Sequence, residues 1–153
     1  MQISPRCESF SRIAAAAVAT ALLQGCGTPT PPSPLVAFTT QMRSANEVPV
    51  NRSIGSGTVD AVLNKETNLF RWKVSYSGLS GPATAGHFHG PAAVGVNAGV
   101  ALPWQMPLKS PLEGRATLSP AQAGDLLAGR WYANIHTAAN PAGEVRGQIT
   151  VRH

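Results

Sequence analysis

Cysteine is almost absent from this chain of 153 residues, which contains only Cys7 and Cys26. Both lie near the N-terminus, so the rest of the chain carries no thiol. A disulfide framework and a cysteine-ligated zinc site are therefore excluded for everything after Cys26. Any metal site in that part of the chain must depend on other ligands, such as histidine.

Charged residues are also few, at 12% of the chain, and the basic ones are scattered singly along the sequence. No basic block and no stripe of basic and aromatic residues marks a nucleic-acid surface, so we expect no nucleic-acid partner. Signatures of enzymes are weak as well. Ser77, Ser80 and Ser110 lack the setting of a nucleophile elbow, no glycine-rich loop joins a strand to a helix, and the acidic residues form no evident catalytic pair. The sequence therefore favours a protein that is not an enzyme.

The first apolar run is too short for a permanent membrane span. Arg6 and Arg12 precede an alanine-rich stretch over residues 13–23, whereas a spanning helix needs about 20 apolar residues. A basic start, a short apolar run and small residues before a cleavage site are typical of a secretory signal peptide. The next residues, Leu23-Gln24-Gly25-Cys26, resemble a bacterial lipobox. The resemblance implies cleavage before Cys26 and attachment of lipid to its thiol.

These features divide the chain into three parts. Residues 1–25 form the expected signal peptide, residues 26–34 the lipidated Cys26 with a proline-rich tether, and residues 35–153 a single folded domain. Gly27 stands where an aspartate would resemble a signal for retention in the inner membrane. We therefore expect the protein in a bacterial cell envelope, anchored by lipid in the membrane, with the periplasmic face of the outer membrane favoured.

Alternating apolar residues and frequent turn signals fill the rest of the chain. The clearest alternation covers residues 69–76, where Trp72 lies on the apolar side and is expected in the core. Ser119 as N-cap, Gln122 as its capping-box partner and Gly129 as a stop predict one short helix. Gly143 is expected to take a positive φ where the chain turns into its last strand. Strands are predicted at residues 35–42, 54–63, 69–76, 84–90, 99–104, 112–118, 130–137 and 143–151. Seven or eight short strands and one helix predict an all-β fold, an antiparallel β-sandwich of immunoglobulin-like or Cu/Zn superoxide dismutase-like type.

Three groups of residues resemble a known family. They are Glu47-Val48-Pro49 with Gly55-Ser56-Gly57, residues 85–92 around His87-Phe88-His89, and residues 131–137 followed by residues 140–149. In order and spacing they resemble the CHRD domain, a module named after the developmental regulator chordin and found in many bacterial envelope proteins. The resemblance covers nearly all of residues 35–151. It implies a β-sandwich, and it implies much less about activity.

Two histidines, His87 and His89, lie two residues apart on a predicted strand. Both should project from one face of that strand, and Phe88 from the other. Their Cα atoms would be about 6.5–7 Å apart, which lets two imidazoles converge on one ion. If the strand at residues 130–137 is a neighbour, His136 could supply a third nitrogen.

Imidazole ligation suits copper or zinc, so these are the candidate metals. Asn134 or Glu144 could orient an imidazole through a hydrogen bond without touching the ion. Met42 and Met106 could add sulfur, although their placement does not follow from the sequence.

The same residues also admit interpretations without a metal. The histidines could hydrogen-bond loop carbonyls, and the domain would then bind an envelope protein or a glycan. The His-x-His pattern on a sandwich also resembles Cu/Zn superoxide dismutase, but that enzyme has a bridging histidine, a zinc-binding aspartate and a disulfide. A domain without cysteine does not fit this pattern. We therefore expect a lipid-anchored, non-enzymatic binding module, with copper or zinc as candidate ligand and an envelope protein or glycan as the alternative.

Overall fold

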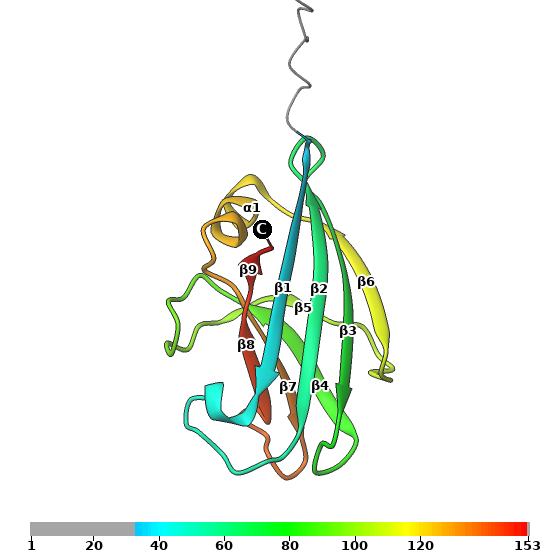
Figure 1. Ribbon diagram of the computed structural model, residues 1–153, viewed down its shortest axis with the longest axis vertical. Coiled ribbons are helices and arrows are strands. Elements are labelled where there is room, and N and C mark those ends of the chain that lie inside the picture. The colour runs from blue at the N-terminus through cyan, green and yellow to red at the C-terminus, as the bar shows by residue number, and fades with distance from the viewer. Residues whose placement is uncertain (1–32, 153) are drawn as a thin grey trace, which may run out of the picture. The chain divides into compact units, whose positions relative to one another are not determined.

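A computed structural model describes residues 33–152 of the chain (Figure 1). The predicted signal peptide, Cys26, most of the proline-rich tether and His153 lie outside these residues. The described residues belong to one compact unit, Pro32–His153. Between residues 33 and 152, no helix is both long and apolar enough to cross a membrane.

The described residues form nine strands, one α-helix and one 3-10 turn. In chain order these are β1 (Leu35–Arg43), η1 (Ser44–Asn46), β2 (Ser56–Asn64), β3 (Leu69–Ser77), β4 (Ala83–His89), β5 (Val100–Pro103), β6 (Leu112–Thr117), α1 (Pro120–Leu127), β7 (Tyr132–Thr137), β8 (Val145–Gln148) and β9 (Thr150–Val151). The predicted all-β fold with one short helix is confirmed. One detail differs, because the single strand expected at residues 143–151 is divided into β8 and β9.

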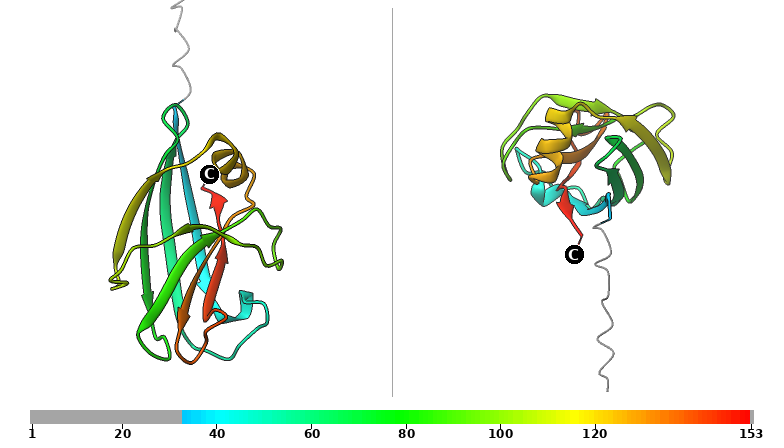
Figure 2. Two further views of the ribbon diagram at one scale, coloured as in Figure 1. Left: turned by 180° about the vertical axis from the view of Figure 1, so that it is seen from behind. Right: turned by 90° about the horizontal axis from the view of Figure 1, so that it is seen from above.

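All strand pairs are antiparallel, and the sheet follows the order β5-β4-β7-β8-β1-β2-β3-β6, with β9 also paired to β1. The sheet curls on itself, as the view from above shows (Figure 2). Its two halves therefore face each other like the two layers of a sandwich. The long strand β1 belongs to both halves, since it pairs with β2 along its whole length, with β9 near its middle and with β8 at its C-terminal end.

Aromatic side chains fill the space between the two halves. Phe88 of β4 lies at the centre, and its ring centroid is 5.3 Å from each of those of Phe70, Trp72 and Trp104. All three contacts are edge-on, the arrangement that aromatic rings prefer. Trp72 is 6% exposed, so its predicted place in the core is confirmed.

The helix α1 begins and ends as its sequence predicts. The Ser119 hydroxyl accepts a hydrogen bond from the Gln122 backbone N–H, and the Gln122 side chain accepts one from the Ser119 N–H. Pro120 occupies the first turn, where no backbone donor is needed. Leu126 is buried in the hydrophobic core.

Replacing Trp72 by alanine should lower the free energy of unfolding by about 3–5 kcal/mol, as for other large aromatics in cores. Urea unfolding followed by circular dichroism measures this change. Ile54→Ala is the control, because Ile54 is 93% exposed and its loss should cost less than about 0.5 kcal/mol. Equal stability of the Trp72→Ala variant and the parent would contradict the packing described above.

Gly143→Val should destabilise the domain by about 1–3 kcal/mol, through both backbone strain and a steric clash. Gly143 has a φ of +136°, and an added Cβ would lie 2.6 Å from a carboxylate oxygen of Glu47. Gly124→Val is the matched control, since nothing lies within 4 Å of a Cβ added there. If the two variants had the same melting temperature, neither backbone strain nor the clash at Gly143 would affect the stability of the domain.

Candidate metal centre

Strands β4 and β7 are neighbours, which brings the three candidate histidines together. In the register of this pair, Ala85 lies opposite His136 and His87 opposite Asn134. Because Phe88 points into the core, His87 and His89 project from the other face of β4. The ring centroid of His87 is 5.1 Å from that of His136 and 5.4 Å from that of His89. One nitrogen from each ring can be chosen so that all three lie within 4.8 Å of one another.

Backbone carbonyls determine which nitrogen carries the proton in two of these rings. The Nδ1 atoms of His89 and His136 lie 2.9 Å from the carbonyl oxygens of Ala98 and Pro141, respectively. A carbonyl can only accept, so each Nδ1 carries the hydrogen and each Nε2 of the neutral ring keeps a lone pair. The Nε2 of His136 is also 3.3 Å from the Nδ1 of His87. Both lone pairs are thus directed into the space between the rings.

Asn134 occupies the centre of this cluster and is only 4% exposed. Its Oδ1 lies 3.1 Å from the Nε2 of His89 and 3.0 Å from the Nε2 of His136. In this orientation, three lone pairs meet at one place, which favours a cation. With the amide turned by 180°, its NH₂ group would donate to both imidazoles and satisfy the cluster without a metal. Asn134 therefore separates a metal-binding state from a hydrogen-bonded one.

The imidazoles of His87 and His89 are held in the neutral form. Burial, together with the nearby His136 and His89 rings, lowers the pKa of His87 to about 4. Burial also lowers the pKa of His89, although the hydrogen bonds that the protonated ring would donate to Ala98 and Asn134 oppose the change. Because a metal binds neutral imidazole, these two ligands need not lose a proton at neutral pH.

A stack of planar groups sets the orientation of the His89 ring. Tyr132 lies parallel to it, with the planes 2° apart and the centroids 4.8 Å apart. The guanidinium of Arg146 lies 3.4 Å from the centre of the Tyr132 ring. Arg146 is itself buried, and it donates to the Asn97 side chain at 2.8 Å and to the Val96 carbonyl at 2.6 Å. The role of Arg146 was not predicted, and alternation along a single strand gives no signal for a buried arginine.

Glu144 does not contact the imidazoles through hydrogen bonds. Among residues 33–152, its carboxylate accepts hydrogen bonds only from a backbone N–H and from hydroxyl groups. The donors are Ser53 at 2.6 Å, the N–H and hydroxyl of Ser80, both at 2.7 Å, and the Thr137 hydroxyl. Burial raises the pKa of Glu144, but these hydrogen bonds together outweigh it and hold the pKa at about 2. Of the two residues predicted to orient an imidazole, the structure places Asn134 against the rings and Glu144 in a network that fastens three loops.

The two methionines considered as sulfur ligands lie in different surroundings. Met42 is fully buried in the hydrophobic core, and Met106 is 66% exposed in the connection between β5 and β6. The candidate donor set therefore consists of three imidazoles.

Comparison with known proteins agrees with this architecture. Residues 38–149 match the model of the CHRD domain family. No match was found among curated proteins or among solved structures. The matched residues extend from β1 to the end of β8 and include the three histidines and Asn134. CHRD is a binding-type domain and not a known enzyme family. This match covers more than half of the chain, and the chain therefore belongs to the CHRD domain family.

Proposed function

We propose that this protein is a lipid-anchored binding module of the bacterial cell envelope that holds a copper or zinc ion on His87, His89 and His136. The observation that carries the proposal is the convergence of the two Nε2 lone pairs, each fixed by a backbone carbonyl bonded to Nδ1 of the same ring. A short sequence motif alone does not produce such convergence, because it also requires the register of β4 and β7 to bring the rings together and each ring to turn its Nε2 toward the others.

The spacing of the nitrogens suits an ion of this size. A tetrahedral ion with bonds of about 2.0–2.1 Å holds its ligands about 3.3–3.4 Å apart. The Nδ1 of His87 and the Nε2 of His136 are already 3.3 Å apart. The widest separation in the cluster is 4.8 Å, so binding requires ring movements of about 1–2 Å.

The environment of the rings favours reversible binding over burial of a structural ion. His87 and His136 are half-buried, so the metal would keep a position open to water or to a donor from a partner. Three neutral imidazoles leave the charge of a divalent ion uncompensated, which favours an anionic fourth ligand. Copper(II) should bind more tightly than zinc, following the usual order of divalent metals.

Binding of metal to the unit Pro32–His153, purified without a histidine tag and stripped with chelator, tests this function. Titration with zinc or copper(II) at about pH 7, where His87 is neutral, should show one ion per chain. His87→Gln and His136→Gln should each weaken binding by about tenfold or more, because each removes one of three ligands. His153→Gln is the matched control, since it removes a histidine that is not one of the three proposed ligands.

Equal affinity of the parent and the His87→Gln variant would contradict the metal site. The cluster would then serve as a hydrogen-bonded element around the Asn134 amide, in a module that binds a protein or glycan. Asn134→Asp separates the two states further. If the ion lies between the rings, the carboxylate should make the variant bind metal more tightly than the parent. If no ion binds there, the variant and the parent should bind metal equally.

The lipid anchor is proposed from the lipobox-like residues Leu23-Gln24-Gly25-Cys26. No other cysteine follows Cys26 in the sequence, so lipid would attach to its thiol. Each buried CH₂ of a lipid chain adds about 0.8 kcal/mol of membrane affinity, so several chains anchor firmly. Replacing Cys26 by alanine should move the protein from the membrane fraction to the soluble fraction of bacterial cells. Membrane association that survives this substitution would contradict the anchor and leave the metal site untouched.

A further inference from the structure

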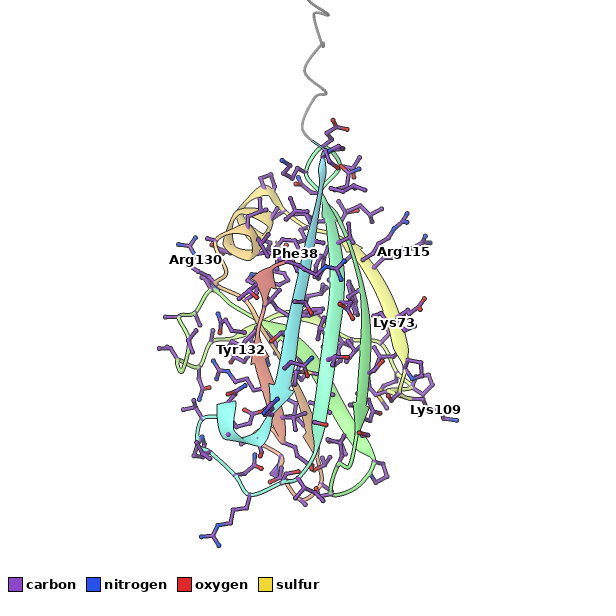
Figure 3. The ribbon with its side chains drawn as sticks, viewed as in Figure 1. Phe38, Lys73, Lys109, Arg115, Arg130 and Tyr132 are labelled. Carbon is purple, nitrogen blue, oxygen red and sulfur yellow. The ribbon has the colours of Figure 1, made fainter. Side chains whose placement is uncertain are left out.

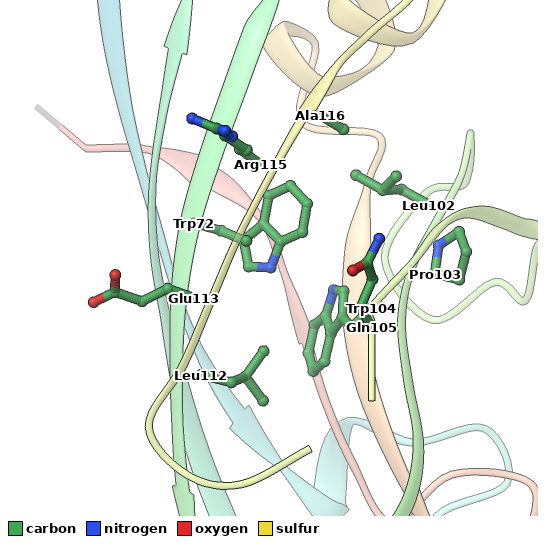
Figure 4. A pocket seen from close by; sticks show the side chains of 10 residues that line it. Trp72, Leu102, Pro103, Trp104, Gln105, Leu112, Glu113, Arg115 and Ala116 are labelled. Carbon is green, nitrogen blue, oxygen red and sulfur yellow. The ribbon is translucent and has the colours of Figure 1, made fainter. Parts of the chain in front are cut away.

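The two edges of the curled sheet, β5 and β6, lie on either side of a groove of about 510 Å³. Residues 102–105 line one side of this groove, residues 112–116 line the other, and Trp72 contributes from β3 (Figure 4). Within residues 33–152, each edge strand pairs with one neighbour only, β5 with β4 and β6 with β3. The groove therefore runs along two unpaired strand edges.

The two edges differ in their capacity to accept another strand. Strand β5 has four residues, an irregular register beside His89 and a proline, Pro103, at its end. Short length, irregularity and proline are the usual protections of a sheet edge. Strand β6 has six residues without proline, so it exposes backbone N–H and C=O groups along one side. The free edge of β6 is the better template for pairing.

The inward residues of β6 leave room beside this edge. Leu112, Gly114 and Ala116 face inward and alternate with exposed residues. Gly114 lies directly on Trp72, since a Cβ added there would be only 2.3 Å from the indole ring. The Trp72 indole thus takes up the space over Gly114, and the small side chain of Ala116 leaves room in the groove for side chains that come from elsewhere.

Two buried donors in the wall of the groove lack acceptors. Trp72 and Trp104 are each 6% exposed, and the Nε1 of neither ring has a hydrogen-bond partner in the described part of the chain. Figure 4 shows the two indole nitrogens turned toward each other across the groove. An unpaired buried N–H is costly, so an occupant that supplies an oxygen gains from pairing with it.

The outer face of this edge carries positive charge. Arg71 of β3 and Arg115 of β6 are register partners, so two like charges lie opposite each other. No ion pair with either arginine occurs among residues 33–152, whereas the neighbouring Lys73 lies 3.9 Å from Glu113. Lys73 and Arg115 lie on the same side of the molecule, over β3 and β6 (Figure 3). An acidic residue beside Arg115 would relieve this repulsion.

We propose that the free edge of β6 binds an extended peptide segment of another protein in which apolar and acidic residues alternate. The backbone of the segment pairs with β6 as an additional strand. Its apolar side chains point into the groove, and its acidic side chains lie on the outer face beside Arg115 and Arg71. An oxygen of the segment accepts from an indole N–H of the groove after a small rotation of that ring. This site is separate from the histidine cluster and does not depend on a metal.

Three capped peptides of equal length test the proposal on the unit Pro32–His153, with tryptophan fluorescence as the readout. A peptide of alternating valine and glutamate should bind and shift the emission. A peptide of alternating valine and lysine should bind about tenfold more weakly or worse, because it meets Arg71 and Arg115. A valine–glutamate peptide with prolines at its centre should not bind, since it lacks the N–H groups that a β-ladder requires.

Charge reversal at the edge provides the matched variants. Arg115→Glu should exchange the preference of the protein for the glutamate and lysine peptides, and Arg52→Glu, an exposed change in the η1–β2 connection, should leave it as in the parent. Equal binding of the proline peptide, or no effect of Arg115→Glu, would overturn the proposal. So would a dimer that the glutamate peptide does not dissociate, observed by sedimentation. Antiparallel pairing of two β6 strands about Gly114 places Glu113 opposite Arg115 of the second copy, and such a dimer would assign this edge to self-association.

Discussion

Burial of Phe88 between the two halves of the curled sheet is the constraint on which the histidine cluster depends. Its edge-on contacts with Phe70, Trp72 and Trp104 each contribute about 0.5–1.5 kcal/mol beyond burial of apolar area. Adjacent residues of a strand point to opposite faces, so a buried Phe88 places His87 and His89 together on the outer face. A slip of β4 by one residue would bury both histidines and expose the phenylalanine. The hydrophobic core thus determines which face of β4 carries the polar chemistry.

The same core does not determine how the imidazoles are oriented. Hydrogen bonds from the rings to loop carbonyls orient them. The carbonyl of Ala98 comes from the segment before β5, and that of Pro141 from the link between β7 and β8. Glu144 holds this link through Thr137, and it also binds Ser53 and Ser80 on two other loops. Its low pKa, about 2, keeps the carboxylate charged at neutral pH, so the carboxylate continues to accept these hydrogen bonds. Glu144 therefore supports the site indirectly, through the loop that anchors His136.

Much of the fold could be predicted from the sequence, because local patterns encode it. Alternation with a period of two identified the strands, and the Ser119–Gln122 capping box identified the start of the helix. The partnership of His87, His89 and His136 was also predictable in outline, since it required only that β4 and β7 be neighbours. What could not be predicted depends on register between distant segments. The burial of Arg146 on Tyr132, the hydroxyl network of Glu144 and the break between β8 and β9 all arise from residues that are far apart in the chain.

The open edge of the sheet follows from the same aromatic packing that positions the histidines. Complete closure of a sheet would pair β5 with β6 and leave no free edge. Here each of two indoles takes up the space over a glycine, Trp72 over Gly114 and Trp104 over Gly86, where an added Cβ would lie only 2.2–2.3 Å from the ring. Because these rings stand between the two halves at their open side, the edges remain apart. The packing that buries Phe88 thus also maintains a groove along β6, a strand that makes no contribution to the histidine cluster.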